Sequence, residues 1–312
     1  MKNLKFLIVG FGSIGKRHYN NLVNLSYEVY VYSYRKNKNP NNLNEGIKFV
    51  NELENAIEKV NAVIICNSTE KHLEVALLAS SKGKHIFVEK PLSHNLNNLK
   101  NLEKNLKSNK IIFASGFMLR KHPNLIFIKE LIRKRELGKI YYANASIGQD
   151  LRKWRKNYDY TKGYAANSET GGGVTLDLIH EIDLINWLIG EAEIIFALLG
   201  FNKELNINTE SISNISIKTY EDIICNIQLD YLCPVLKRKL EIVSENGIIN
   251  WDFKTNIVSF TNKEDHKEEL HKVDKNFERN LMYLEEMKEF IEKIKSNNFD
   301  LSHFNSACNA LK

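Results

Sequence analysis

The sequence predicts two domains: an α/β domain with a doubly wound parallel sheet, followed by an α+β domain with a mostly antiparallel sheet. Two observations support this prediction. Up to about residue 117, short apolar runs alternate with helical stretches, which is the order that βαβ units produce. From residue 194 onward, short apolar runs follow one another and are separated by turn pairs such as Asn246-Gly247. We therefore expect one domain at residues 1–118 and a second at residues 119–312.

Composition narrows the class of protein. The chain has 312 residues, of which 43% are hydrophobic, and this is enough for two cores. The formal net charge is +6 with scattered lysines, which tolerates anionic ligands but does not indicate nucleic-acid binding. The four cysteines lack CxxC spacing, so we expect no metal site, no disulfide framework and a reducing cytoplasm. No apolar run approaches the ~20 residues of a membrane span, and the run at residues 6–9 is too short for a signal peptide.

The chain opens with a predicted strand, a glycine-rich turn and a helix. Residues 4–9 are apolar, residues 10–15 read GFGSIG, and a helical stretch extends to about residue 24. In such a GxGxxG turn the glycines permit close approach of a pyrophosphate, and the helix N-terminus supplies N–H groups and a positive dipole end. We therefore predict a dinucleotide-binding Rossmann domain, with cofactor contacts from Gly10, Gly12, Ser13, Ile14 and Gly15.

The end of the second strand, at residues 28–33, bears on which dinucleotide binds. In NAD-selective domains an acidic residue usually ends this strand and binds the ribose hydroxyls. Here the strand ends in Ser33 and is followed by Tyr34, Arg35 and Lys36, so the acid is missing and cations follow. Ser33 and Arg35 could bind a 2′-phosphate, and the sequence slightly favours NADP over NAD. The alternative is an exposed polar turn without influence on the cofactor.

Polar residues also follow the predicted strand at residues 62–66. Ligands of doubly wound sheets bind at the carboxyl ends of the strands, so we assign Asn67, Ser68 and Thr69 to the cofactor groove. The alternative role, which is compatible with the first, is capping of the helix at residues 70–82. His72 lies in the first turn of that helix and is predicted as a capping or groove residue.

The strand at residues 85–88 is followed by Glu89, Lys90 and Pro91. Proline restricts the residue before it, so this lysine is fixed between an acid and a proline. A solvated loop lysine is the alternative, but it explains this setting poorly. An ammonium beside a nicotinamide can hydrogen-bond a substrate hydroxyl and favour its ionisation. We predict that Glu89 and Lys90 line the cofactor site and that Lys90 is catalytic.

The remaining elements follow in order along the chain. A polar helix at residues 95–108 and a strand at residues 111–115 complete the first domain. Pro123 opens a helix that Gly138 ends. Further strands are expected at residues 139–148, 194–199, 211–219, 223–229, 239–243, 247–251 and 257–260, and an amphipathic helix at residues 277–295.

Residues 150–168 are expected to form a loop that is rich in basic and aromatic side chains. Aromatic faces stack on sugar rings, and arginines bind phosphates or carboxylates. We predict substrate contacts from Trp154, Arg155 and Tyr164. An arm packed on a second subunit is an equally good interpretation.

The stretch at residues 170–190, TGGGVTLDLIHEIDLINWLIG, predicts a buried helix because its apolar residues fall on every side. At about 100° per residue, Asp177, His180 and Glu181 would share one facet of that helix. Buried ionisable groups are costly unless they are paired or used. Acids that cap the helix would explain Asp177 but not His180, because a cation is unfavourable at the positive end of the dipole. We predict that Asp177 and His180 are catalytic.

Together these features resemble the Gfo/Idh/MocA family of sugar and inositol oxidoreductases. The resemblance extends over nearly the whole chain, which we expect to end within the family's last helix. It depends on GFGSIGKRH at residues 10–18, EKPLS at residues 89–93, WR at residues 154–155, GGG at residues 171–173, Asp177, His180, Asp183 and WL at residues 187–188.

The resemblance implies a Rossmann domain, an open-faced sheet domain that often mediates dimers or tetramers, and a catalytic group of Lys90, Asp177 and His180. Many members place the aspartate and histidine four residues apart with a glycine between them. Here they are three apart and Ile179 precedes the histidine, as in a branch of the family found in bacterial surface-sugar gene clusters. This departure makes His180 a firmer assignment than Asp177.

The implied activity is reversible oxidation of a secondary alcohol on a sugar, cyclitol or nucleotide-sugar, with NADP or NAD. His180 would take the hydroxyl proton, Lys90 would stabilise the developing alkoxide, and Asp177 would orient the histidine or a substrate hydroxyl. This requires the ammonium and the imidazole to meet over one nicotinamide ring. A homodimer or homotetramer is expected. The alternatives are a non-catalytic dinucleotide-binding sensor with a protein partner, and an enzyme that reduces an imine or a tetrapyrrole.

Overall fold

The computed structural model describes residues 4–34, 46–154 and 158–312. The chain forms two units, and each is described by itself. Unit 1 comprises Met1–Phe117 and Asn280–Lys312, and unit 2 comprises Met118–Arg279. The last 33 residues (280–312) therefore group with the N-terminal part of the chain, whereas the sequence predicted a second domain of residues 119–312.

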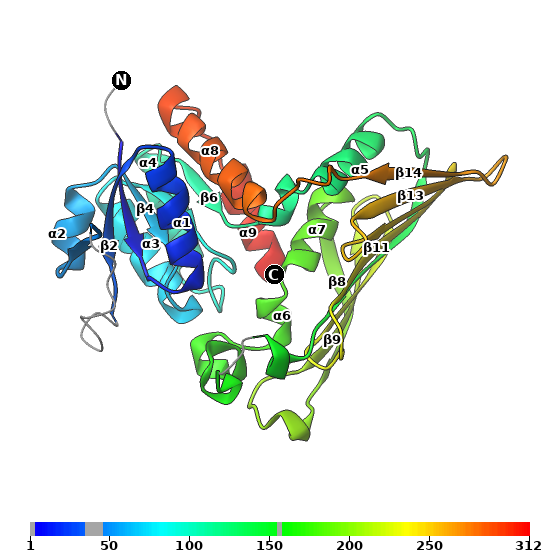
Figure 1. Ribbon diagram of the computed structural model, residues 1–312, viewed down its shortest axis with the longest axis horizontal. Coiled ribbons are helices and arrows are strands. Elements are labelled where there is room, and N and C mark those ends of the chain that lie inside the picture. The colour runs from blue at the N-terminus through cyan, green and yellow to red at the C-terminus, as the bar shows by residue number, and fades with distance from the viewer. Residues whose placement is uncertain (1–3, 35–45, 155–157) are drawn as a thin grey trace. The chain divides into compact units, whose positions relative to one another are not determined.

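Unit 1 is built on a six-stranded parallel sheet with strand order β3-β2-β1-β4-β5-β6 (Figure 1). Its strands read as continuous apolar runs because both faces of the sheet are covered; Phe6 to Val9 are all 0% exposed. The order reverses beside β1, which is where ligands bind in doubly wound sheets. The strands are β1 (Lys5–Val9), β2 (Glu28–Tyr32), β3 (Lys48–Val50), β4 (Ala62–Ile65), β5 (His85–Val88) and β6 (Phe113–Ser115).

Helix α8 belongs to the core of unit 1. Its residues Met287, Phe290 and Ile291 are buried in one apolar cluster with Phe6 and Ile8 of β1. The sequence predicted this amphipathic helix, but its apolar side alone does not specify the sheet on which it packs. The helices of unit 1 are α1 (Ser13–Asn24), α2 (Leu53–Glu58), α3 (His72–Ser81), α4 (Leu99–Ser108), α8 (Asn280–Ser296) and α9 (Ser302–Leu311).

Unit 2 contains an eight-stranded sheet with strand order β14-β13-β12-β11-β7-β10-β9-β8 (Figure 1). All neighbouring pairs are antiparallel except β10 with β7, which confirms the predicted mostly antiparallel sheet. The strands are β7 (Ile140–Gly148), β8 (Ala192–Gly200), β9 (Ile212–Thr219), β10 (Ile224–Asp230), β11 (Lys237–Ser244), β12 (Gly247–Asp252), β13 (Ile257–Asn262) and β14 (Glu268–Lys272).

Helices cover one face of the unit 2 sheet. Helix α7 packs on β7 and β10, and the strands bury every second residue accordingly. The helices are α5 (Pro123–Arg133), α6 (Val174–Asp177) and α7 (His180–Leu188). Short 3₁₀ turns occupy Thr69–Lys71 in unit 1 and Met118–Lys121, Leu151–Lys153, Tyr160–Lys162, Tyr164–Ala166, Ser168–Thr170 and Lys203–Leu205 in unit 2.

The helix predicted after the three glycines of the stretch 170–190 is divided into α6 and α7. Leu178 leaves the helical region with ψ 26°, and the Glu181 N–H bonds to the Leu178 carbonyl in a tighter turn. Asp177 therefore ends one helix and His180 begins the next, so Asp177, His180 and Glu181 do not lie on one continuous helix as expected. Among the described residues, no helix combines the length and apolar character required to cross a bilayer.

Candidate active site

The glycine turn after β1 has the geometry that a dinucleotide requires. Gly10 has φ 96°, and a Cβ atom there would lie 2.5 Å from the main-chain nitrogen of Asn67. A Cβ atom at Gly15 would overlap the carbonyl oxygen of Gly10, whereas the space around Gly12 is open. Gly12 is the N-cap of α1, and no side chain caps the helix there. The first N–H groups of α1 are thus free of a side-chain acceptor and suit an anionic group.

Asn67 follows β4, the neighbour of β1 in the sheet. Both polar atoms of its side-chain amide are buried and have no hydrogen-bond partner among the described residues. A buried amide without partners is costly, so this side chain suits a site that a polar ligand completes. The residues present here therefore fit a bound dinucleotide. The neighbouring Ser68 hydroxyl donates to Glu70 Oε1 at 2.5 Å, and Thr69 is buried in the following turn.

Of the two residues predicted to select the cofactor, Ser33 and Arg35, the structure describes only Ser33. Ser33 follows β2 directly and is half-buried. Arg35 lies outside the described residues. The preference for NADP therefore stays a prediction.

Lys90 follows β5 and lies between two residues that buried histidines hold. Glu89, which is 8% exposed, accepts a hydrogen bond from His18 Nε2 at 2.6 Å. His72 is 2% exposed; its Nδ1 lies 2.7 Å from the Pro91 carbonyl oxygen and its Nε2 lies 3.2 Å from the Asn67 carbonyl oxygen. Burial lowers the pKa of His72. His72 thus contacts main chain after β4 and directly after Lys90, a role the sequence did not distinguish from contact with the cofactor.

One cluster of the described residues has the composition of a metal site. Ligand atoms of His18, Glu89 and Glu286 all lie within 4.8 Å of one another, and the three residues are buried. The short hydrogen bond from His18 to Glu89 already explains why two of these side chains lie together. We therefore describe the cluster as a hydrogen bond between α1 and the segment after β5, with the Glu286 carboxylate of α8 close by.

In unit 2, Asp177 is held by two tyrosines. The carboxylate is 4% exposed and accepts hydrogen bonds from Tyr164 Oη at 2.5 Å and from Tyr231 Oη at 3.2 Å. Burial, and then the nearby Asp177 charge, raise the pKa of Tyr231 well above its usual value. Nothing in the sequence marked Tyr231, which follows β10 and lies 54 residues from Asp177.

The predicted loop residues extend this network. The Trp154 and Tyr231 rings pack edge-on, with their centroids 5.4 Å apart. The Trp154 Nε1–H donates to the Gln149 carbonyl at 3.2 Å. Trp154, Tyr164 and Asp177 are therefore brought together around Tyr231. Arg155 lies outside the described residues.

The other acids of the predicted cluster are paired with arginines. Glu181 lies 2.7 Å from Arg238, and both side chains are buried. Asp183 is bound by Arg120 through two hydrogen bonds of 3.0 and 2.5 Å. These ion pairs fix α7, at whose first residue His180 stands, 7% exposed. Lys90 belongs to unit 1 and His180 to unit 2, so their meeting at one nicotinamide ring stays a prediction.

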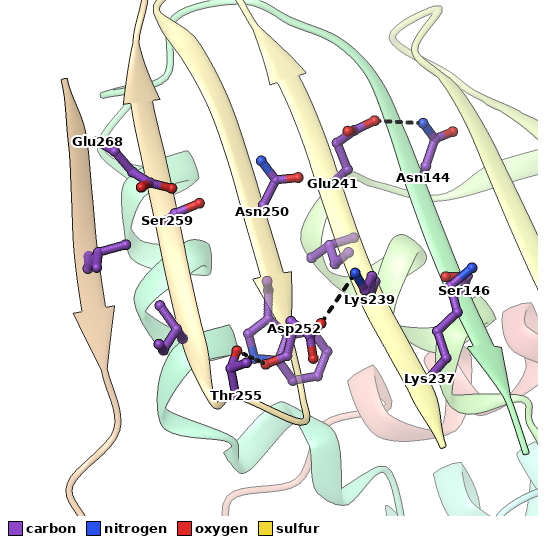
Figure 2. Close-up of a pocket in the computed structure, with 14 residues that line it drawn as sticks. Asn144, Ser146, Lys237, Lys239, Glu241, Asn250, Asp252, Thr255, Ser259 and Glu268 are labelled. Carbon is purple, nitrogen blue, oxygen red and sulfur yellow. Dashed lines mark hydrogen bonds and ion pairs between the residues drawn. The ribbon is translucent and has the colours of Figure 1, made fainter. Parts of the chain in front are cut away.

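A hollow of about 520 Å³ lies on the open face of the unit 2 sheet and contains none of the predicted site residues. Figure 2 shows polar and charged side chains standing on β7, β11, β12, β13 and β14 around it. Lys237 and Lys239 face a surface that also carries Glu241, Asp252 and Glu268. A shallow surface of mixed charge suits a protein contact better than a small-molecule site.

Two family models match the chain. The one described as "Oxidoreductase family, NAD-binding Rossmann fold" matches residues 4–117, and the one described as "GFO/IDH/MocA C-terminal domain" matches residues 126–250. The myo-inositol 2-dehydrogenase of Thermotoga maritima is 29% identical over 201 residues, 61% of this chain and 56% of that protein. The scyllo-inositol 2-dehydrogenase (NAD(+)) of Bacillus subtilis is 33% identical over 149 residues, 47% of this chain and 40% of that protein. The chain thus matches about half the length of these curated relatives.

Among solved structures, levoglucosan dehydrogenase in complex with NADH superposes with a TM-score of 0.87 at 17% identity, over 99% of this chain and 94% of that one. A myo-inositol 2-dehydrogenase from Lactobacillus plantarum gives a TM-score of 0.79 at 22% identity, over 100% of this chain and 95% of that one. At these identities the likeness shows the fold, and it confirms the predicted architecture.

Proposed function

Because the chain belongs to the Gfo/Idh/MocA family of oxidoreductases, we propose that it transfers a hydride between a nicotinamide dinucleotide and a secondary alcohol or ketone of a sugar, cyclitol or nucleotide-sugar. The observation that carries this proposal is the arrangement within unit 1. The glycine turn, Asn67 and Lys90 follow β1, β4 and β5, three neighbouring parallel strands, and so share one edge of the sheet. The named relatives that act on inositols support the substrate class.

A nicotinamide dinucleotide at this edge would supply the hydride acceptor or donor. The residues of unit 1 would bind and orient it. The uncapped N-terminus of α1, at Gly12 to Ile14, would bind the pyrophosphate, and the Asn67 amide would find polar partners. We propose a slight preference for NADP, since no acid ends β2.

We propose that Lys90 and His180 act on the same substrate hydroxyl. The imidazole of His180 would accept the hydroxyl proton, because imidazole titrates near neutral pH. The ammonium of Lys90 would stabilise the negative charge that grows on the oxygen. Asp177 already accepts two phenol hydrogen bonds, which supports an orienting role.

The aromatic group around Tyr231 supports a sugar-like substrate. Trp154 and Tyr164 present ring faces and a hydroxyl within one connected network. We propose that these two residues, together with Arg155, contact the substrate.

We further propose a homodimer or homotetramer in which the open sheet face is covered by a second copy. The hollow in Figure 2 carries both lysines and carboxylates, so a two-fold axis can bring opposite charges together. The edge strand β8 adds exposed apolar side chains, among them Ile195 at 59% and Phe196 at 58%. We propose the cytoplasm as the compartment because all four cysteines are free thiols.

A two-step experiment tests the proposed reaction. A thermal-shift panel of NAD, NADP, inositols and nucleotide-sugars identifies ligands, because a bound ligand raises the apparent stability. NAD(P)H formation or consumption is then followed with the same polyols and with the matching keto-sugars. Turnover with a polyol or keto-sugar supports the proposal. Dinucleotide binding without turnover of any such compound would favour the sensor instead.

A further inference from the structure

The residues on either side of Lys90 are each fixed by a buried histidine. We propose that His18 and His72, together called the histidine clamp, are positioning residues that hold Glu89 and Pro91 and thereby the main chain from which Lys90 projects. The assignment rests on the proposed role of Lys90 in the reaction. It adds two residues that touch neither substrate nor reacting atoms.

The His18 half of the clamp comes from helix α1. The imidazole is 0% exposed, and its Nε2 lies 2.6 Å from Glu89 Oε1. The ring packs edge-on against Phe87 at 5.1 Å, so it has little freedom to turn. Glu89 is confined from another side, because a Cβ atom at Gly116 would lie only 2.8 Å from Glu89 Oε2. The carboxylate therefore lies against Gly116 through Oε2, and His18 donates to its Oε1.

The His72 half comes from helix α3. Its Nδ1 lies 2.7 Å from the Pro91 carbonyl oxygen, and its Nε2 lies 3.2 Å from the Asn67 carbonyl oxygen. A neutral imidazole carries one N–H, and the shorter distance assigns that hydrogen to Nδ1. His72 therefore donates from Nδ1 to the Pro91 carbonyl, directly after Lys90. Its Nε2 lies beside the Asn67 carbonyl, which follows β4.

Both helices begin at the predicted cofactor-binding loops. Helix α1 starts within the glycine turn, at Ser13, and α3 follows Asn67, Ser68 and Thr69. The clamp consequently links the main chain that would bind the dinucleotide to the main chain that carries the ammonium. Alignment of a reacting group is worth large factors in rate, and a misplacement of about 1 Å can cost ~100-fold. The expected effect of loosening the clamp is thus on kcat and not on cofactor affinity.

The two ring nitrogens used by the clamp allow a sharp test. The amide nitrogen of asparagine occupies the place of imidazole Nδ1, and that of glutamine occupies the place of Nε2. His18→Gln and His72→Asn should therefore keep the donor, whereas His18→Asn and His72→Gln should lose or displace it. We expect kcat to fall by about 10- to 100-fold in His18→Asn and His72→Gln, and by less than about threefold in His18→Gln and His72→Asn. The Kd for NADH or NADPH should stay within about twofold in all four.

His85 provides a matched control. It lies at the opposite end of β5, and its Nδ1 accepts the Ile112 N–H at 3.1 Å. His85→Gln removes a comparable hydrogen bond from the same strand and should leave kcat within about twofold. If kcat of His18→Asn and His72→Gln falls no further than kcat of His85→Gln, the clamp has no positioning role.

Hydrogen exchange of the peptide that covers residues 89–93 supplies a readout that does not need turnover. Exchange should be faster than in the unmodified protein for His18→Asn and His72→Gln, and unchanged for the other pair and for His85→Gln. Equal exchange in all variants would overturn the clamp even if the enzyme is active. If the unmodified protein turns over no substrate, the proposed function fails, while the exchange pattern still decides whether the clamp exists.

Discussion

The two units hold their predicted reactive groups by different means. In unit 1, Lys90 stands in a segment that is tied to neighbouring helices by hydrogen bonds from His18 and His72. In unit 2, His180 begins a helix that two buried ion pairs fix, through Arg238 and Arg120. The first arrangement consists of one imidazole hydrogen bond to a carboxylate and one to a main-chain carbonyl. The second depends on pairs of opposite charges that must both be present.

This difference predicts how each unit responds to substitution. Removing one member of a buried ion pair leaves an uncompensated charge, which costs more than the pair itself contributed. Removing a hydrogen bond to the main chain costs less, but it releases the segment that the bond held. Substitutions in unit 2 should therefore act first on stability, and substitutions around Lys90 should act first on rate.

The largest expected effect is on turnover. Lys90→Met keeps the unbranched stem of the side chain and removes the ammonium, so we expect kcat to fall by about 100- to 1000-fold. The Kd for the dinucleotide should change by less than about threefold, because Lys90 is proposed to act on the substrate oxygen. Steady-state kinetics and fluorescence titration with NADPH measure the two quantities. Turnover near the level of the unmodified protein would remove Lys90 from the reaction.

The second effect tests the ion pairs of unit 2. Arg238→Met leaves Glu181 buried and charged without this partner, and we expect the free energy of unfolding to fall by about 3–5 kcal/mol. Urea denaturation measures this change. Arg133→Met is the matched control, since its pair with Glu130 is exposed and contributes little. Recovery of most of the loss in Arg238→Met/Glu181→Leu would confirm that the unpaired charge is the cause, and a further loss would contradict it.

Much of unit 1 was predictable because its signals are local. The glycine turn, the polar residues after β4 and the Glu89-Lys90-Pro91 segment all lie next to the strands that position them. What the sequence did not reveal is where Glu286 belongs, because α8 returns to unit 1 after the whole of unit 2. An amphipathic helix shows which side is apolar but not which sheet receives it.

Less of unit 2 was predictable because its partners are distant. Glu181 and Arg238 are 57 residues apart, and Tyr231 and Asp177 are 54 apart. Single-chain periodicity gives no information on such contacts. The continuous helix expected at residues 170–190 also failed to form, since the turn at Leu178 separates Asp177 from His180. The cluster of acids correctly indicated buried charge. Two of these acids, Glu181 and Asp183, form ion pairs that stabilise the position of α7.

The next effect compares neutral histidines in the two units. Burial lowers the pKa of His122 in unit 2 to about 4, and burial also lowers that of His72 in unit 1. His122 accepts the Asn124 N–H at Nδ1 and donates from Nε2 to Asn256, so the folded state needs the neutral ring. Because the folded-state pKa lies below the usual 6.5, the unfolded chain binds the proton first. The contribution of His122 to the free energy of unfolding is therefore fully present above about pH 6.5 and declines as the pH falls towards 4.

We expect this loss to reach about 3 kcal/mol at pH 4 for His122. His122→Gln keeps a neutral polar side chain and should flatten the decline of unfolding free energy between pH 7 and pH 4. Urea midpoints at pH 7, 5.5 and 4 measure it. His266→Gln, at an exposed position, is the control. Parallel pH curves for the unmodified protein and His122→Gln would show that other groups cause the acid sensitivity.

The smallest effect separates orientation from charge at Asp177. Tyr164→Phe removes the shorter of its two phenol hydrogen bonds, and Tyr231→Phe removes the longer. Each change should lower the free energy of unfolding by about 1 kcal/mol, since the remaining phenol still binds the carboxylate. If Asp177 orients the reacting groups through Tyr164, Tyr164→Phe should also lower kcat, by about tenfold, while Tyr231→Phe should not. A kcat equal to that of the unmodified protein in both variants would assign both phenols to folding alone, and Asp177 would then act through the substrate or through His180.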